Sequence, residues 1–241
     1  MSQTLSLEAL LKRDRLVIAA GLAGVSLVAW GYLVFEARRM YATGVCCCAG
    51  MKMSGPDVDA WSAGVILPLF LMWAEMMVAM MIPTVAPTVL TFALLNRKRR
   101  EQERPFVATS AFLGGYLAVW TVFSLMIAIA QWALHGAAML STLMASRSAW
   151  LGDGLLVAAG LFQFTPWKHA CLRHCRSPLD SLIAGWREGG WGAFVMGWRN
   201  GAYCTGCCWV LMALLFVFGV MNVLWIAALT SQWIGSHATF V

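Results

Sequence analysis

The chain has 241 residues, of which 61% are hydrophobic and only 12% are charged. A soluble domain carries about 25% charged residues, so this composition excludes the soluble globular classes. The net charge of +6 requires no nucleic-acid partner, because basic loops on one side of the bilayer are typical of membrane proteins. We therefore expect an all-α, polytopic helical membrane protein whose main surroundings are the lipid bilayer.

Five apolar stretches predict about five transmembrane helices in one integral membrane domain covering residues 1–241. The second stretch is much longer than the about 20 residues that a crossing needs, so we expect Pro83 and Pro87 to kink or interrupt it. The segment 134–149 has the composition of a short interfacial piece, and the tail after Ser231 is too short and mixed to cross again. The predicted spans cover approximately 16–35, 61–96, 106–133, 150–165 and 203–229.

Basic residues are distributed unequally between the segments that connect these spans. The segments 1–15, 97–104 and 166–200 hold thirteen Lys and Arg residues, whereas 36–60 and 134–149 hold four. Cytoplasmic loops of membrane proteins are enriched in Lys and Arg. The asymmetry predicts a cytoplasmic N-terminus and, with five spans, a periplasmic C-terminus.

Two groups of cysteines give the strongest chemical signal. In each group, two thiols stand four residues apart, a spacing that puts them on the same side of a helical turn. Both groups border the basic segment 166–200, so we expect them to meet at the cytoplasmic face and to offer four or five thiolates to Cu(I) or, alternatively, zinc. Free Cys is also a small buried hydrophobe, so packing without a metal is the competing interpretation. The two groups are Cys171 with Cys175, and Cys204 with Cys207 and Cys208.

Methionines follow the second apolar stretch in two rows at helical spacing. Thioethers are soft ligands that can pass Cu(I) between sites, and Met76, Met80 and Met81 are the candidate ligands. Met also fills irregular gaps between crossing helices, which is the alternative role. Glu75 is the one acid deep within a span, and an intramembrane carboxylate is a functional candidate.

Three consecutive cysteines, Cys46 to Cys48, precede Met51 and Met53 on the expected outer face. Adjacent thiols have poor geometry for disulfides with one another. A soft-metal entry site, a lipidation site and an oxidised cluster are the three interpretations left open.

The motifs carrying these residues resemble a bacterial family of predicted metal-binding integral membrane proteins. The resemblance implies metal binding and a bacterial inner-membrane location. The Cys46–Cys48 cluster and Glu75 depart from the family pattern. The matching motifs are Arg13-Asp14-Arg15, Trp73-x-x-Met76-x-x-Ala79-Met80-Met81-x-Pro83, Gly115-Tyr116-x-x-x-Trp120, Gln163-x-x-Pro166-x-Lys168-x-x-Cys171-Leu172-x-x-Cys175-Arg176-x-Pro178, Cys204-x-Gly206-Cys207-Cys208-Trp209 and Gly219-Val220-Met221-Asn222.

Three functions compete at this point. The first is Cu(I) handling by a membrane carrier, chaperone or permease with a cysteine site at the cytoplasmic face. The second is a non-catalytic accessory subunit of a larger membrane metalloenzyme complex, in which the thiols are structural. The third is a membrane thiol-redox protein, which the spacing Cys204-x-x-Cys207 allows although no βαβ context accompanies it. The chain contains no hydrolase triad, phosphate loop or HExxH motif, so hydrolytic catalysis has no support.

Overall fold

The computed structural model describes residues 2–43, 45–46, 51–52, 63–100, 109–136, 149–176, 178–218, 220 and 222–238. Within them the chain is helical apart from a hairpin that pairs β1 (Val45–Cys46) with antiparallel β2 (Met51–Lys52), so the predicted all-α class is confirmed. The helices are α1 (Ser2–Thr43), the 3-10 helix η2 (Ala63–Val65), α2 (Ile66–Arg100), α3 (Thr109–Gly136), α4 (Ala149–Gln163), α5 (Pro166–Arg176), α6 (Pro178–Ala184), α7 (Gly189–Ala213), α8 (Leu215–Phe218) and α9 (Val223–Ala238).

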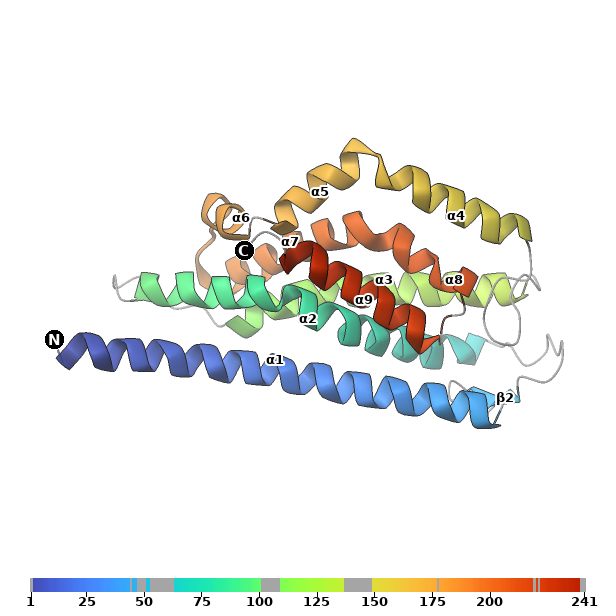
Figure 1. The fold of residues 1–241 in the computed structure, drawn as a ribbon, viewed down its shortest axis with the longest axis horizontal. Coiled ribbons are helices and arrows are strands. Elements are labelled where there is room, and N and C mark those ends of the chain that lie inside the picture. The colour runs from blue at the N-terminus through green and yellow to red at the C-terminus, as the bar shows by residue number, and fades with distance from the viewer. Residues whose placement is uncertain are drawn as a thin grey trace.

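The long helices form a bundle in which α2 packs between α1 and α3, and α3 packs between α2 and α7 (Figure 1). The shorter α5 packs on α7, and α9 packs on α2. By length and composition, four helical segments of the described chain can cross a membrane. These segments are Leu16–Arg39, Ile66–Arg97, Thr109–Leu134 and Gly189–Phe218.

Three of these segments lie close to the predicted spans 16–35, 61–96 and 106–133, whereas the helix bounds differ from the last two predicted spans. The predicted span 150–165 corresponds to α4, whose 15 residues are too few for a full crossing. The predicted span 203–229 begins too late, because α7 already starts at Gly189. The predicted loop 166–200 therefore contains α5, α6 and the first half of α7, and the tail after Ser231 continues α9 to Ala238.

The two prolines of the second span lie inside α2, which continues through both of them. The predicted interruption is therefore absent, whereas Figure 1 shows the axis of α2 changing direction midway along the helix. A proline has no N–H, so Pro83 leaves the carbonyl of Ala79 without its helical donor. The indole N–H of Trp30 in α1 donates to that carbonyl at 2.9 Å. The carbonyl that Pro83 leaves free thus accepts a hydrogen bond that holds α1 against α2.

The short α4 ends because the next helix begins with a proline. The residue before a proline is disfavoured in the α region, and the helix breaks at Phe164 and Thr165. Pro166 is the first residue of α5, a position where its missing N–H costs no helical bond. The hydroxyl of Thr165 accepts from the backbone N–H of Lys168 at 3.4 Å and caps the new helix. Helices α4 and α5 therefore form an elbow over α7 (Figure 1).

Helices α3 and α7 approach each other through glycines. A Cβ at Gly197 would overlap the carbonyl of Phe112, and a Cβ at Gly115 would overlap the carbonyl of Phe194. A Cβ at Gly201 would lie 3.0 Å from the carbonyl oxygen of Tyr116. Small residues at such crossings let helix backbones pack closely, as membrane helices do.

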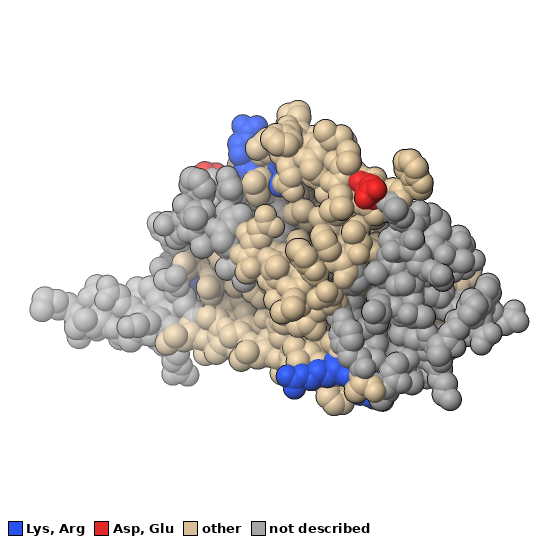
Figure 2. Space-filling view, turned by 45° about the vertical axis from the view of Figure 1, so that its right-hand side comes forward, with Lys and Arg blue, Asp and Glu red and all other residues tan. Residues whose placement is uncertain are grey.

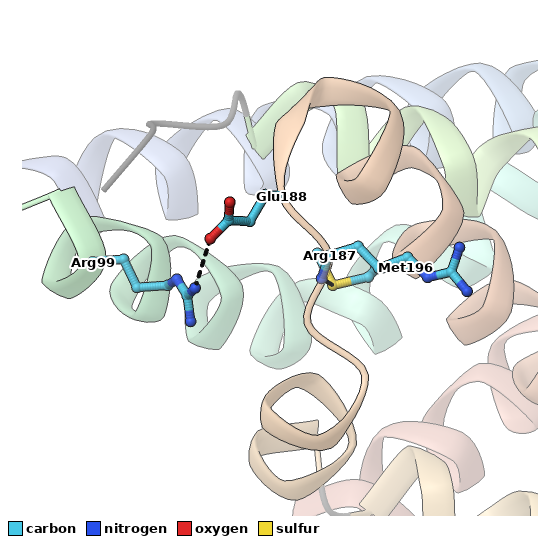
Figure 3. Close-up of polar contacts among 4 residues, drawn as sticks. All are labelled: Arg99, Arg187, Glu188 and Met196. Carbon is cyan, nitrogen blue, oxygen red and sulfur yellow. Dashed lines mark hydrogen bonds and ion pairs between the residues drawn. The ribbon is translucent and has the colours of Figure 1, made fainter. Parts of the chain in front are cut away.

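The loop before α7 is held to the end of α2 by a cation and an aromatic ring. The guanidinium of Arg99 forms an ion pair with Glu188 at 3.3 Å (Figure 3). The same guanidinium lies 4.6 Å from the ring centroid of Trp186. The sulfur of Met196 accepts a hydrogen bond from the backbone N–H of Arg187 at 3.4 Å (Figure 3). These contacts set where α7 begins relative to α2.

Apolar side chains face outward from several long helices. Figure 2 shows charged residues at the edges of the described surface and none at its centre. Contiguous exposed apolar surface is unusual for a soluble monomer and typical of a helix that faces lipid. On α1 the most exposed of these side chains are Leu16, Val17, Leu27 and Val28, each more than 60% accessible.

Candidate copper site

Three of the predicted site cysteines lie on one buried side of α7. Cys204, Cys207 and Cys208 are 7%, 0% and 1% exposed. The thiols of Cys207 and Cys208 each donate to the backbone carbonyl of Cys204 at 3.0 Å. The spacings of three and four residues, recognised in the sequence, are what bring both thiols over the same carbonyl.

The first cysteine group reaches α7 through α5. The sulfur of Cys171 lies 3.2 Å from the position that a Cβ on Gly206 would occupy, so it fills the space left by that glycine beside Cys207. Burial raises the pKa of the Cys171 thiol above its ordinary value, and the nearby Cys207 thiol raises it further. Cys175 lies in α5, but its side chain is outside the described part of the structure. Cys171 of the first group thus lies against the segment of α7 that carries the second group.

The depth of the thiols differs from the sequence-based expectation. They were expected at the cytoplasmic boundary because the last span was predicted to begin near residue 203. Helix α7 begins at Gly189, so Cys204 lies fifteen residues, or about 22 Å, along the helix. The thiols are therefore near the middle of the candidate span Gly189–Phe218.

The number of potential ligands that lie close together determines which metal ion these residues can bind. Among the described residues, no three His, Cys, Asp or Glu side chains are close enough together to hold a metal ion. Structural zinc usually needs four such ligands, so a ready-made zinc site is absent from this part of the chain. Cu(I) is a softer ion that accepts two thiolates, and the thiols of Cys171 and Cys207 approach from separate helices.

The three candidate methionines of α2 are buried in the helix bundle. Met76, Met80 and Met81 are 1%, 0% and 1% exposed and belong to the common apolar core. The hydroxyl of Thr84 donates to the carbonyl of Met81 at 2.8 Å and lies 3.8 Å from the Met81 sulfur. The burial fits both the packing role and the role of internal thioether ligands.

Glu75 faces a second carboxylate that the sequence did not single out. Glu36 of α1 is 6% exposed and forms an ion pair with Arg39 at 3.8 Å. Tyr32 hydrogen-bonds Glu36 and interacts electrostatically with Glu75. One carboxylate oxygen of Glu75 is fully buried without a hydrogen-bond partner. No sequence signal marked Glu36, because it lies at the polar end of the first span.

Tyr116 and Gly206 are further residues that sequence reasoning did not assign to the site. The Tyr116 hydroxyl donates to the sulfur of Cys204 at 3.3 Å, across 88 residues of sequence. Both residues belong to motifs of the family resemblance, which was the one signal available. Cys46 lies in β1, while Cys47 and Cys48 fall outside the described residues.

Together these features define an all-α protein whose described residues include four helices apolar enough to cross a membrane, with thiols and thioethers buried between the helices. The chain belongs to the PpoB2 copper chaperone family, whose model matches residues 70–235. The match contains most of α2, all of α3 to α8 and most of α9, and therefore every predicted metal-site residue. The copper handling expected from the soft side chains is confirmed at the level of the family. No curated protein and no solved structure matches the chain.

Proposed function

We propose that this protein is an integral membrane copper chaperone that carries Cu(I) on thiols contributed by α5 and α7. The observation that carries the proposal is the position of the Cys171 sulfur over Gly206, beside Cys207. Two thiols from separate helices can close on one Cu(I) ion, with Cys204, Cys208 and Cys175 as further ligands for receiving or releasing it. Copper is the cargo of this protein.

The buried setting suits a carrier that must take up copper and pass it on. The raised pKa of the Cys171 thiol favours its protonated form, so this ligand is neutral near neutral pH before copper binds. Copper binding replaces this proton, because the thiolate is the metal ligand. A neutral Cys171 thiol tolerates the apolar surroundings of α7 without a bound cation.

Copper binding to single-cysteine variants tests the proposal. Purified protein in detergent is titrated with Cu(I) without oxygen, in competition with a chromogenic chelator. Cys171→Ser and Cys207→Ser should each weaken binding at least tenfold, as should Gly206→Ala, whose methyl group displaces the Cys171 sulfur. Gly160→Ala is the matched control, because nothing lies within 4 Å of a Cβ there.

A second candidate function is the accessory subunit with structural thiols. It is favoured by the hydrogen bonds of Cys207 and Cys208 to the Cys204 carbonyl, which occupy both thiols without a metal. A variant with Ser at all five site cysteines separates the two functions. Equal copper content in this variant and in the unmodified protein would reject the chaperone site and favour the accessory subunit.

The proposal also gives Met76, Met80 and Met81 a role as thioether ligands on a route through the bundle. All three are buried, so copper would reach them only between helices. Replacing Met by Leu nearly conserves volume and packing while removing the sulfur ligand. Leu variants should slow copper transfer to an acceptor chelator at unchanged thermal stability. Loss of stability at unchanged transfer would assign these residues to packing.

We further propose that the bundle spans the bacterial inner membrane with the N-terminus in the cytoplasm. The N-terminus, the basic end of α2, helix α6 and the start of α7 lie at the same end of the molecule (Figure 1). In intact spheroplasts, a membrane-impermeant thiol reagent should label a variant retaining only Cys47 and spare one retaining only Cys175. Rapid labelling of Cys175 would reverse the orientation.

A further inference from the structure

Helix α3 brings one polar group to the thiol cluster of α7. The Tyr116 hydroxyl donates to the Cys204 sulfur at 3.3 Å, and the two residues are 1% and 7% exposed. The contact is held by the backbone of both helices, because Gly201 meets the Tyr116 carbonyl at the same crossing. The hydroxyl therefore reaches the sulfur without help from solvent.

Cys204 is the centre of the thiol cluster on α7. Its carbonyl accepts the thiols of Cys207 and Cys208, while its own sulfur accepts the Tyr116 hydroxyl. A neutral thiol is a weak acceptor, whereas a thiolate accepts a hydrogen bond that is shorter and stronger because it is charge-assisted. The Tyr116 contact thus gains strength when Cys204 loses its proton.

A second buried polar atom lies next to Cys204 in the sequence of α7. The hydroxyl of Thr205 is buried without a hydrogen-bond partner. Buried polar groups are normally hydrogen-bonded, so unpaired ones require an explanation. Newly formed thiolates would add acceptor capacity at this crossing that the thiol form lacks.

We propose that Tyr116 is a positioning residue for copper: its hydroxyl orients and stabilises the Cys204 thiolate in the copper-loaded state. This inference rests on the proposed copper-chaperone function. On loading, the S–H bond of each liganding thiol breaks, an S–Cu bond forms, and one proton per thiol passes to the buffer. Tyr116 keeps its own proton and shares it with the sulfur as a hydrogen-bond donor. No electron is transferred, and copper remains Cu(I).

The experiment compares Cu(I) affinity in the Tyr116→Phe variant and in a double-mutant cycle with Cys204→Ser. Loss of a hydrogen bond to a charged group should weaken Cu(I) binding about tenfold in the Tyr116→Phe variant. In the Cys204→Ser background, Tyr116→Phe should have no further effect, because the sulfur it serves is gone. Tyr203→Phe is the matched control, since the Tyr203 ring stacks on His174 with 4.0 Å between the two ring centroids, rather than on a thiol of α7.

The outcomes separate this inference from the function on which it rests. Failure of the unmodified protein to bind Cu(I) rejects the proposed function. Copper binding with unchanged affinity in Tyr116→Phe rejects the role of Tyr116 alone. Equal weakening in both backgrounds assigns Tyr116 to packing and also overturns the inference.

A second measurement tests the contact if Tyr116→Phe does not fold. Copper loading of the unmodified protein should produce a tyrosine difference spectrum in the near ultraviolet, because the hydroxyl acquires a charged acceptor. The signal should be absent in Cys204→Ser and present in Tyr203→Phe. A signal that persists in Cys204→Ser would overturn the inference.

Discussion

The hydrogen bond from Trp30 to Ala79 should stabilise the bundle only because Pro83 frees that carbonyl. Trp30→Phe removes the indole donor at 2.9 Å and leaves a carbonyl between helices without a partner. Interhelical hydrogen bonds in membrane proteins contribute on average about 0.6 kcal/mol and at most about 1.7 kcal/mol. With the smaller ring also burying less surface, we expect Trp30→Phe to lower the free energy of unfolding by about 1 to 2 kcal/mol.

Restoring the backbone donor separates the hydrogen bond from the ring contact. In Pro83→Ala the new N–H can donate to the Ala79 carbonyl, so Trp30→Phe should cost about 1 kcal/mol less in that background. Pro87→Ala is the control, because its new N–H can donate to a different carbonyl, that of Pro83, and should leave the cost of Trp30→Phe unchanged. Unfolding is followed by far-ultraviolet circular dichroism in mixed micelles with increasing SDS. An equal cost of Trp30→Phe in all three backgrounds would refute the reasoning.

Three further predictions follow from the described contacts. Gly197→Ala should lower the free energy of unfolding by about 2 to 3 kcal/mol, because its methyl group overlaps a backbone carbonyl of α3; Gly154→Ala, with open space around it, should not lower stability in the same SDS titration. Glu75→Gln should raise the free energy of unfolding in detergent by about 1 kcal/mol, since it removes a carboxylate with an unpaired buried oxygen. The melting temperature should rise accordingly, and a lower melting temperature would contradict this prediction. In a variant retaining only Cys171, the rate of alkylation should rise with increasing pH, and the midpoint of this rise should lie above the ordinary thiol pKa because burial favours the unreactive protonated form. A midpoint at or below the ordinary thiol pKa would contradict the burial of this sulfur.

The sequence predicted the class of fold because hydrophobicity is additive along a chain. Three spans were located from apolar length alone, and the bend of α2 followed from Pro83 and Pro87. The errors arose where apolar length is ambiguous. The segment 189–202 resembles a loop by composition, because it contains several Gly residues, two Trp residues and Arg199, yet it is the first half of α7. Two of the glycines that weaken the hydrophobic signal there, Gly197 and Gly201, are the ones that let α3 approach.

The candidate site divides in the same way between local spacing and long-range packing. Residue spacing along one helix was enough to place Cys204, Cys207 and Cys208 on one side of α7, because helical geometry fixes positions three and four residues apart. The position of Cys171 over Gly206 and the bond from Tyr116 to Cys204 join segments separated by tens of residues. Such contacts depend on where each helix begins and how closely the backbones cross. The sequence by itself therefore determined the soft side chains and their local pattern, whereas the tertiary structure decided that Cys171 packs over Gly206 and that Cys204, Cys207 and Cys208 are buried within the bundle.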